Sequence, residues 1–387
     1  IRHNVPSCKK SINLLFILLV YLLASGYALA AAPVPAPPQV AASGHLLVDY
    51  YSGRVLSEEN ADQRLEPASL TKIMTAYVVM RELALGNVSL SDQVRVSKKA
   101  WRTPGSRMFI EVDKQVPLEL LLQGMIIASG NDASVALAEH IAGSEETFAN
   151  LMNDHARRLG MLDTHFVNST GLPDENHYTT ARDIAKVTKA SISEFPEYYD
   201  WYAVKSFTFN DITQQNRNRL LWRDDKVDGV KTGHTEGAGY CLVSSAKEGA
   251  MRLIAVVMGT NSEDARAKES QSLLNYGFRF FETHRLYGVG DALSRVRVWK
   301  GDKEKVALGL TEDLYVTIPR RQYDRLKASM SVDPQLTAPI DKGRRLGKVT
   351  IALSGQTVAE MPLVALQQIN EGGIINQIKD SVLLWFE

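Results

Sequence analysis

Apolar and polar positions follow two different periods over the first two thirds of the chain. Apolar residues at helical spacing predict helices over residues 69–85, 116–128, 179–190 and 262–281. Alternating residues predict strands over residues 45–51, 54–56, 240–245 and 251–258, and a further short strand that ends at Lys231. These elements predict a sheet flanked by helices, within a first domain that covers residues 45–284.

The pattern changes after residue 285. Short alternating stretches occur at residues 296–299, 314–318, 326–332, 347–353 and 357–364, with turn residues between them. Repeated short strands separated by turns are typical of an all-β domain. The sequence therefore predicts an α+β chain in which the helix-flanked sheet is followed by a small β-rich domain over residues 285–371.

The first 44 residues have the pattern of an export signal and a lead-in. Lys9 and Lys10 precede an apolar run over residues 14–24, and Ala28-Leu29-Ala30 matches a cleavage site. A retained membrane helix is disfavoured because the apolar run is short. We expect residues 1–30 to be a removed signal peptide and residues 31–44 to be an extended, proline-rich lead-in.

The last residues, 372–387, predict an amphipathic helix. Beyond Gly372 and Gly373, large apolar residues recur at helical spacing and polar residues fall on the opposite side. The apolar positions are Ile374, Ile375, Ile378, Val382, Trp385 and Phe386. Because the segment is too short to span a bilayer, we expect it to lie in the membrane interface. The alternative is a terminal helix that packs on the β-rich domain.

Composition narrows the range of partners. The chain is 45% apolar and 23% charged, which is ordinary for a globular protein, and it has 44 basic and 44 acidic residues. Because basic residues are not in excess, the composition does not indicate nucleic-acid binding. Cys8 lies in the leader, and Cys241 is expected to be a buried hydrophobe. No cluster has zinc spacing and no phosphate loop is present, so neither a metal nor a cofactor is expected.

Three short motifs carry the candidate chemistry. They are Ser69-x-x-Lys72, Ser129-Gly130-Asn131 and Lys231-Thr232-Gly233. A serine hydroxyl needs a base within hydrogen-bond reach to act as a nucleophile, and helix positions i and i+3 share one face. Each motif alone is common by chance, and a lone lysine or Lys-Thr-Gly is more often a surface helix residue or a turn. Their joint order indicates an acyl-transfer enzyme.

At these residues the chain resembles the low-molecular-mass penicillin-binding proteins of the 5/6 type, the D-alanyl-D-alanine carboxypeptidases of serine peptidase family S11. The resemblance covers the leader, the three motifs with their neighbours, the β-rich domain and the tail. It implies a transpeptidase-like fold shared with β-lactamases, removal of the terminal D-alanine from peptidoglycan pentapeptides, and acylation by β-lactam antibiotics. It also implies a location on the periplasmic face of the inner membrane.

The resemblance implies a role for each matching residue. Ser69 would attack the carbonyl of the penultimate D-alanine, with Lys72 as the base. Ser129 and Lys231 would pass the proton to the departing D-alanine, and Asn131 would orient Lys72. The remaining substrate-binding residues would be Lys231 and Thr232 at the terminal carboxylate, Gly233 and His234 along the same strand, and Arg266 near the carboxylate. The oxyanion hole would be formed by the backbone N–H groups of Ser69 and His234. For Arg266 a surface ion pair is the alternative.

Three other functions remain open on the sequence. A serine β-lactamase would need a glutamate and an asparagine to activate a deacylating water, and Glu146-x-x-x-Asn150 matches those letters by chance within a predicted helix. An endopeptidase would share the nucleophile but would not need a cation for a free carboxylate. A catalytically silent muropeptide-binding protein is disfavoured because every catalytic position is intact.

Overall fold

The structure is a computed structural model that describes residues 34–385. The predicted signal peptide and Phe386 lie outside the described residues. The first part of the chain contains a five-stranded antiparallel sheet with the order β2-β1-β9-β8-β7. Its strands are β1 (Gly44–Asp49), β2 (Val55–Glu59), β7 (Val227–Thr235), β8 (Gly239–Glu248) and β9 (Met251–Thr260). Strand β7 therefore lies at the edge of the sheet.

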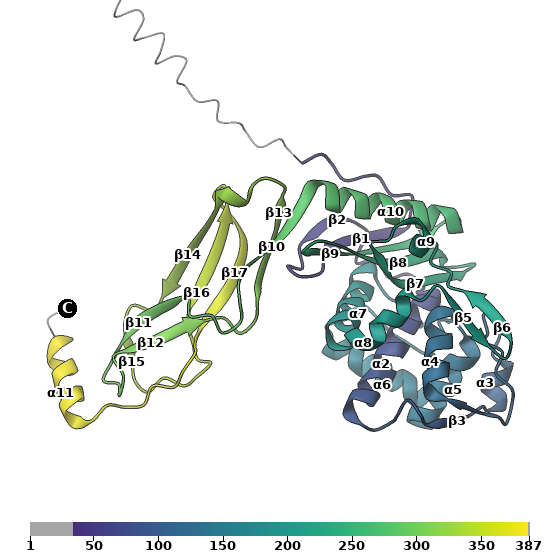
Figure 1. Cartoon of the computed structure of the whole chain (residues 1–387), viewed down its shortest axis with the longest axis horizontal. Helices are drawn as coiled ribbons and strands as arrows, with labels where there is room; N and C mark the ends of the chain where they lie inside the picture. The colour runs from purple at the N-terminus through teal and green to yellow at the C-terminus, as the bar shows by residue number, and fades with distance from the viewer. Residues whose placement is uncertain (1–33, 386–387) are drawn as a thin grey trace, which may run out of the picture. The chain divides into compact units, whose positions relative to one another are not determined.

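Helices cover both faces of this sheet. Helix α10 (Glu263–Phe280) packs on β8 and β9 on one side (Figure 1). The other side carries α2 (Thr71–Leu85), α4 (Leu118–Ile127), α5 (Asn131–Ala142), α6 (Glu145–Arg158) and α7 (Ala181–Glu194). The shorter elements are η1 (Ala68–Leu70), β3 (Gln93–Arg95), α3 (Lys98–Arg102), β4 (Gln115–Pro117), α8 (Pro196–Tyr199), η2 (Asp200–Ala203), β5 (Ser206–Phe209), β6 (Ile212–Gln215) and α9 (Leu220–Arg223).

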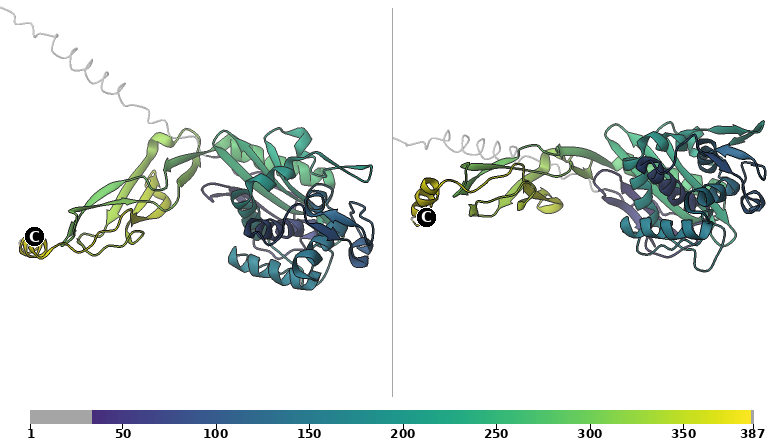
Figure 2. Two further views of the ribbon diagram at one scale, coloured as in Figure 1. Left: turned by 60° about the horizontal axis from the view of Figure 1, so that its bottom comes forward. Right: turned by 90° about the horizontal axis from the view of Figure 1, so that it is seen from below.

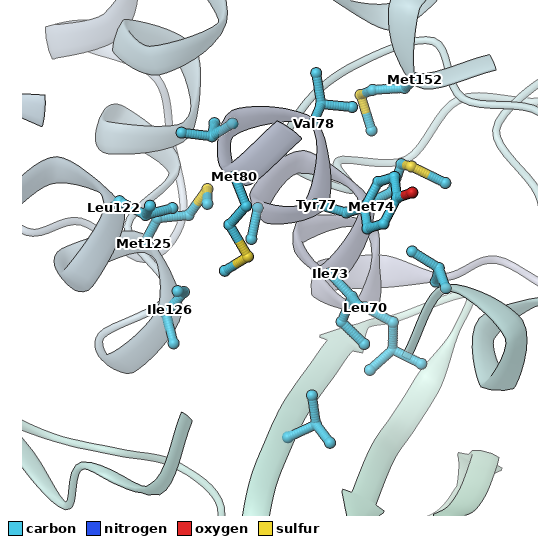
Figure 3. Close-up of a cluster of buried hydrophobic side chains, with 14 of the residues drawn as sticks. Leu70, Ile73, Met74, Tyr77, Val78, Met80, Leu122, Met125, Ile126 and Met152 are labelled. Atoms are coloured by element: carbon cyan, nitrogen blue, oxygen red, sulfur yellow. The ribbon is translucent and has the colours of Figure 1, made fainter. Parts of the chain in front are cut away.

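Helix α2 lies at the centre of the core. Every residue from Thr71 to Met80 is buried, so this helix is surrounded by protein rather than facing solvent on one side. Figure 3 shows its apolar side chains pointing toward Leu122 and Met125 of α4 on one side and Met152 of α6 on another. Each buried large apolar side chain contributes about 1.5–3 kcal/mol. The packing makes α2 a rigid support for the residues at its N-terminus.

Several predicted boundaries differ from the observed ones. The helix expected from Val116 begins at Leu118, because Val116 pairs with Val94 in a two-stranded antiparallel sheet and Pro117 is the residue that precedes the helix. Lys231 lies within β7 rather than at its end, since the strand continues to Thr235. The helix predicted from residue 179 begins at Ala181 after the cap residue Thr180, whose side chain accepts a hydrogen bond from the Asp183 N–H.

The chain beyond α10 is β-rich, as predicted. Strand β10 (Phe281–Tyr287) pairs with β13 (Leu314–Pro319). A six-stranded sheet has the order β14-β16-β17-β12-β11-β15. Its strands are β11 (Ser294–Trp299), β12 (Lys305–Gly309), β14 (Leu326–Val332), β15 (Leu336–Thr337), β16 (Arg345–Leu353) and β17 (Gln356–Ala365), with η3 (Tyr323–Arg325) before β14. With the helix-flanked sheet, this β-rich segment confirms the predicted fold class.

The chain ends in helix α11 (Ile374–Leu383), which both views in Figure 2 show at the end of the β-rich segment. Its apolar side chains face solvent, and Ile374 and Ile375 are 77% and 83% exposed. Its polar side makes the contacts: Asp380 accepts a hydrogen bond from the Lys300 N–H at 2.6 Å and lies 3.7 Å from Arg297. Among the helices of residues 34–385, none is both long and apolar enough to cross a bilayer.

Candidate active site

Ser69 lies in the single turn η1, immediately before α2. The residue before it, Ala68, has a φ of 46°, a left-handed conformation that costs a non-glycine residue about 1–3 kcal/mol. The side chain of Ser69 is half-buried. The turn therefore presents the Ser69 hydroxyl at the N-terminal end of α2, where the helix dipole favours developing negative charge.

Lys72 lies one turn further on and is buried. Its Nζ is 3.0 Å from Ser69 Oγ, 2.7 Å from Asn131 Oδ1 and 2.7 Å from the Thr170 carbonyl oxygen. The last two atoms can only accept hydrogen bonds. A neutral amine has two N–H groups and one lone pair, so with both N–H groups donated to these oxygens its lone pair faces the Ser69 hydroxyl. This geometry suits Lys72 to take the proton of Ser69.

The electrostatics favour the neutral amine. Burial lowers the pKa of Lys72 to about 7, and the positive charge of Arg217 acts in the same direction, whereas Asp132 opposes them. A base whose pKa lies near neutral pH is available in its unprotonated form under ordinary conditions.

The second motif brings Ser129 and Lys231 together. Ser129 has a φ of 64°, and its Oγ accepts a hydrogen bond from Lys231 Nζ at 3.0 Å. Lys231 Nζ also lies 3.1 Å from the Thr232 carbonyl oxygen. Burial lowers the pKa of Lys231 well below its ordinary value, and the charge of Lys72 adds to the effect. Ser129 and Lys231 thus form a buried polar pair beside the Ser69–Lys72 pair.

The third motif runs along the edge strand β7 and passes close to the nucleophile. A Cβ on Gly233 would lie 3.1 Å from Pro67 O and 3.2 Å from Ser69 N. Only glycine lets the two backbones approach this closely. The next residue, His234, packs against Tyr240, with 4.0 Å between the centroids of the two rings. The N–H groups of Ser69 and His234 therefore belong to two segments that meet at this point.

These residues line a cavity of about 430 Å³. It contains Ser69, Ser129, Asn131, Thr232, Gly233, His234 and Arg266 from the predicted set, whereas Lys72 and Lys231 are buried behind it. The side chain of Arg266 is largely committed: it donates to the Gly233 carbonyl oxygen at 3.1 Å and lies 3.5 Å from Glu263. Arg266 thus supports the β7 backbone from within the lining of the cavity.

Arg217 also lines the cavity, and the sequence analysis did not select it. Its side chain is exposed and forms no hydrogen bond or ion pair with another residue in the described part of the chain. The neighbouring Asn216 and Asn218 are buried, and their side chains donate to the carbonyl oxygens of Val204 and Gly229. In the sequence, the available signal was an arginine with an asparagine on either side of it.

A second contribution missed by the sequence analysis comes from the main chain of Thr170. Its carbonyl oxygen accepts from Lys72, and Asn168 fixes the loop by accepting from the N–H groups of Thr170 and Gly171. A Cβ on Gly171 would lie 1.7 Å from the Ala68 carbonyl oxygen. The loop can therefore lie against the nucleophile turn only with glycine at this position.

The β-lactamase letters do not reach this cavity. Glu146 and Asn150 are both exposed on α6, and neither lines the cavity. The preceding Glu145 instead accepts hydrogen bonds from the N–H and hydroxyl of Ser169. Among the described residues that line the cavity, Glu263 is the one with a carboxylate side chain. The guanidinium groups of Arg219 and Arg266 lie within 3.5 Å of that carboxylate. The cavity thus holds no carboxylate free to activate a water.

Cys241 is buried, as predicted, at a position on β8 that pairs with Gly233. Burial raises the pKa of its thiol to about 11. A thiol in that state is not a nucleophile at neutral pH, so the chemistry of the site rests on the serines and lysines.

Residues 31–262 match the family model of the D-alanyl-D-alanine carboxypeptidases, peptidase family S11, and residues 281–371 match the penicillin-binding protein 5 C-terminal domain. The chain belongs to this family. It is a serine-type D-alanyl-D-alanine carboxypeptidase, which confirms the resemblance seen in the three motifs.

Individual relatives resemble the whole chain or a large part of it. D-alanyl-D-alanine carboxypeptidase DacC of Escherichia coli is 47% identical, over 93% of this chain and 92% of the relative. Penicillin-binding protein 5 from Haemophilus influenzae is 43% identical with a TM-score of 0.85, over 87% of this chain and 100% of that one. Penicillin-binding protein D2 from Listeria monocytogenes in its ampicillin-bound form is 27% identical with a TM-score of 0.59, over 63% of this chain and 100% of that one.

Proposed function

We propose that the chain removes the terminal D-alanine from peptidoglycan pentapeptides through an acyl-enzyme on Ser69. The observation that supports this most strongly is the environment of Lys72. Two carbonyl-type oxygens occupy its N–H groups, and the Ser69 hydroxyl is the third neighbour of Nζ. This arrangement has a neutral lysine in place as a base before any substrate binds.

The proposed reaction consists of acylation and deacylation of Ser69, each accompanied by a proton transfer. Ser69 Oγ attacks the carbonyl of the penultimate D-alanine while its proton moves to Lys72. The tetrahedral oxyanion is held by the N–H groups of Ser69 and His234, each worth about 3 kcal/mol of the barrier. The C–N bond then breaks, and the proton taken up by Lys72 passes through the pair formed by Ser129 and Lys231 to the departing D-alanine amine, which leaves Lys72 neutral again. Water, deprotonated by Lys72, hydrolyses the acyl-enzyme and releases the shortened peptide.

Recognition of the free carboxylate is the feature that separates a carboxypeptidase from an endopeptidase. We assign the carboxylate to Thr232 and Lys231, as the family resemblance implies, and add the guanidinium of Arg217, which has no hydrogen-bond or ion-pair partner among residues 34–385. Arg266 contributes through the β7 backbone and through its positive charge. A substrate without that carboxylate would leave the charge of Arg217 in the closed cavity without an anion, which is costly.

The test compares a peptide ending in D-Ala-D-Ala with the same peptide amidated at its C-terminus. We expect the free acid to be turned over and the amide to be a poor substrate, and we expect Lys231→Ala to lose the preference along with most of the activity. Equal rates on acid and amide would assign the protein to crosslink cleavage instead.

The same site is proposed to be acylated by β-lactams, in line with the ampicillin-bound relative. Since the described cavity offers no free carboxylate for a deacylating water, we expect slow release of the penicilloyl group. An electrospray mass measurement after penicillin treatment should show one stable adduct on Ser69. Rapid, repeated hydrolysis of penicillin would favour the β-lactamase alternative.

We further propose that the protein acts on the periplasmic face of the inner membrane, held there by α11, with no nucleic-acid partner. Residues 45–284 would form the catalytic domain, 285–371 the β-rich domain and 372–387 the anchor, after loss of the signal peptide over residues 1–30. The outward apolar face of α11 supports this, because a helix packed on the β-rich domain would bury those side chains.

Deletion of residues 372–387 tests the anchor. The truncated protein should remain in solution when it is sedimented with anionic vesicles, whereas the full-length protein should pellet with them. Turnover of a soluble peptide should be unchanged, since no residue of α11 lines the active-site cavity. Pelleting of the truncated protein would place the anchor elsewhere, and loss of activity would show that α11 is structural.

A further inference from the structure

Three large apolar side chains from separate segments meet on the surface near the active site. Trp101 of α3, Phe109 of the following loop and Ile212 of β6 are 41%, 47% and 40% exposed. They line one depression of about 350 Å³. We call this surface the Trp101 patch; its other lining residues are Arg107, Ile110, Glu111 and Asn210. Figure 1 shows the β5–β6 hairpin beside α3, where the patch lies.

Phe109 is held in a conformation that its side chain alone would avoid. Its φ is 68°, which is unusual for a bulky residue. The carboxylate of Asp132 holds the loop: one oxygen accepts from the Met108 N–H, and the other accepts from the N–H groups of Phe109 and Ile110, all at 2.9–3.2 Å. A buried carboxylate thus maintains a strained backbone whose result is an exposed aromatic ring. Strain of this kind concentrates at functional sites.

The patch is continuous with the active-site cavity through this same loop. Gly105 and Ser106 line the cavity, and Arg107 and Phe109 line the patch. The Asn131 N–H donates to the Ser106 carbonyl oxygen at 2.7 Å, which joins the loop to the second motif. The hairpin is joined to it as well, because Gln214 donates to the Arg107 carbonyl oxygen at 2.9 Å.

We propose that the Trp101 patch binds the N-acetylated amino sugar to which the stem peptide of the substrate is attached. This inference rests on the proposed function. A pyranose ring has an apolar face of C–H groups and a polar rim of hydroxyl and acetamido groups. The patch is lined by aromatic and aliphatic side chains together with the polar side chains of Arg107, Glu111 and Asn210, the combination that ligand sites use for such a molecule.

The lengths agree with this assignment. Four residues separate the scissile carbonyl from the sugar in a pentapeptide stem, and four extended residues span about 13 Å. Phe109 is three residues beyond Ser106, so their Cα atoms are at most about 11 Å apart. The stem peptide is therefore longer than the stretch of loop that separates the cavity-lining Ser106 from Phe109 in the patch.

The experiment compares two substrates, a disaccharide pentapeptide and the same pentapeptide without sugars. Trp101→Ala should lower kcat/KM on the disaccharide substrate about tenfold through KM, the scale of losing one ring contact. The sugar-free peptide should be turned over at the wild-type rate, because Trp101 does not line the cavity. Ile212→Ala, on a different segment, should show the same selectivity and is the second variant if Trp101→Ala fails to fold.

Trp222→Ala is the matched control, since Trp222 is a tryptophan of similar exposure, 45%, outside the patch. An equal loss in that variant, or equal losses on both substrates, would overturn the proposal. So would a loss seen only with a sugar-free crosslinked peptide, which would make the occupant a second peptide. If the wild-type protein released no D-alanine from the sugar-free peptide, the proposed function itself would fail, and this outcome is distinct from the others.

Discussion

His177 gives the stability of the catalytic site a pH dependence that one substitution should remove. The ring is buried, and its Nδ1 accepts a hydrogen bond from the Val167 N–H at 3.1 Å. The proton of the neutral ring is therefore on Nε2, which lies 2.8 Å from Thr71 Oγ1. Thr71 is between Ser69 and Lys72, so this bond joins the loop that contains Thr170 to the start of α2.

The magnitude follows from the burial of the ring. Desolvation lowers the pKa of His177 from 6.5 to about 4. Because the folded-state value is below the unfolded-state value, the unfolded chain takes up the proton first as the pH falls. Stability that is present above pH 6.5 is lost as the pH falls to about 4, and the loss attributable to this residue is roughly 3 kcal/mol.

Urea denaturation of wild type and His177→Gln at a series of pH values measures this difference. A glutamine amide can accept from Val167 and donate to Thr71 without titrating, so we expect the variant to lose about 3 kcal/mol less between pH 6.5 and 4. The other titrating groups are common to both proteins and cancel in the comparison. Parallel pH profiles for the two proteins would refute the reasoning.

Two further predictions concern the basic residues Lys72 and Arg217. Because Lys72 must be neutral to accept the proton of Ser69 and its pKa is about 7, kcat/KM should rise with pH up to about 7 and then level off; a rate independent of pH over this range would contradict its role as base. Arg217→Ala should lower kcat/KM on acid substrates about tenfold or more, the scale of a charge-assisted hydrogen bond. Arg223→Ala, in which a guanidinium already paired with Asp264 is removed, should have little effect, and equal losses in both variants would argue against a contact between Arg217 and the carboxylate.

The sequence predicted the parts of the site that depend on local spacing. Ser69 and Lys72 are one helical turn apart, and Lys231 lies on a strand, as the pattern indicated. The contribution of Thr170 could not be predicted, because it is a main-chain oxygen brought to Lys72 by a loop folded against α2. A backbone acceptor has no residue type that marks it in a sequence.

The pattern of apolar and polar residues also could not predict the ends of elements that are set by strand pairing between segments distant in the sequence. Val116 has the spacing of the helix that follows it, yet its backbone pairs with Val94 in a two-stranded antiparallel sheet. Arg217 is one of many arginines in the sequence, and only the fold shows that it lines the cavity and has no hydrogen-bond or ion-pair partner within the part of the chain that the structure describes. The role of each site residue remains a prediction until it is tested by substitution.

Release of D-alanine by wild type and by Ser69→Ala is the most direct test of the central claim. A diacylated peptide ending in D-Ala-D-Ala is the substrate, and Ser106→Ala is the control, because Ser106 lines the same cavity without a proposed chemical role. We expect sustained release by wild type and by Ser106→Ala, and none by Ser69→Ala, with the circular dichroism spectrum unchanged in all three. Turnover by Ser69→Ala at the wild-type rate would contradict the assignment of Ser69 as the nucleophile.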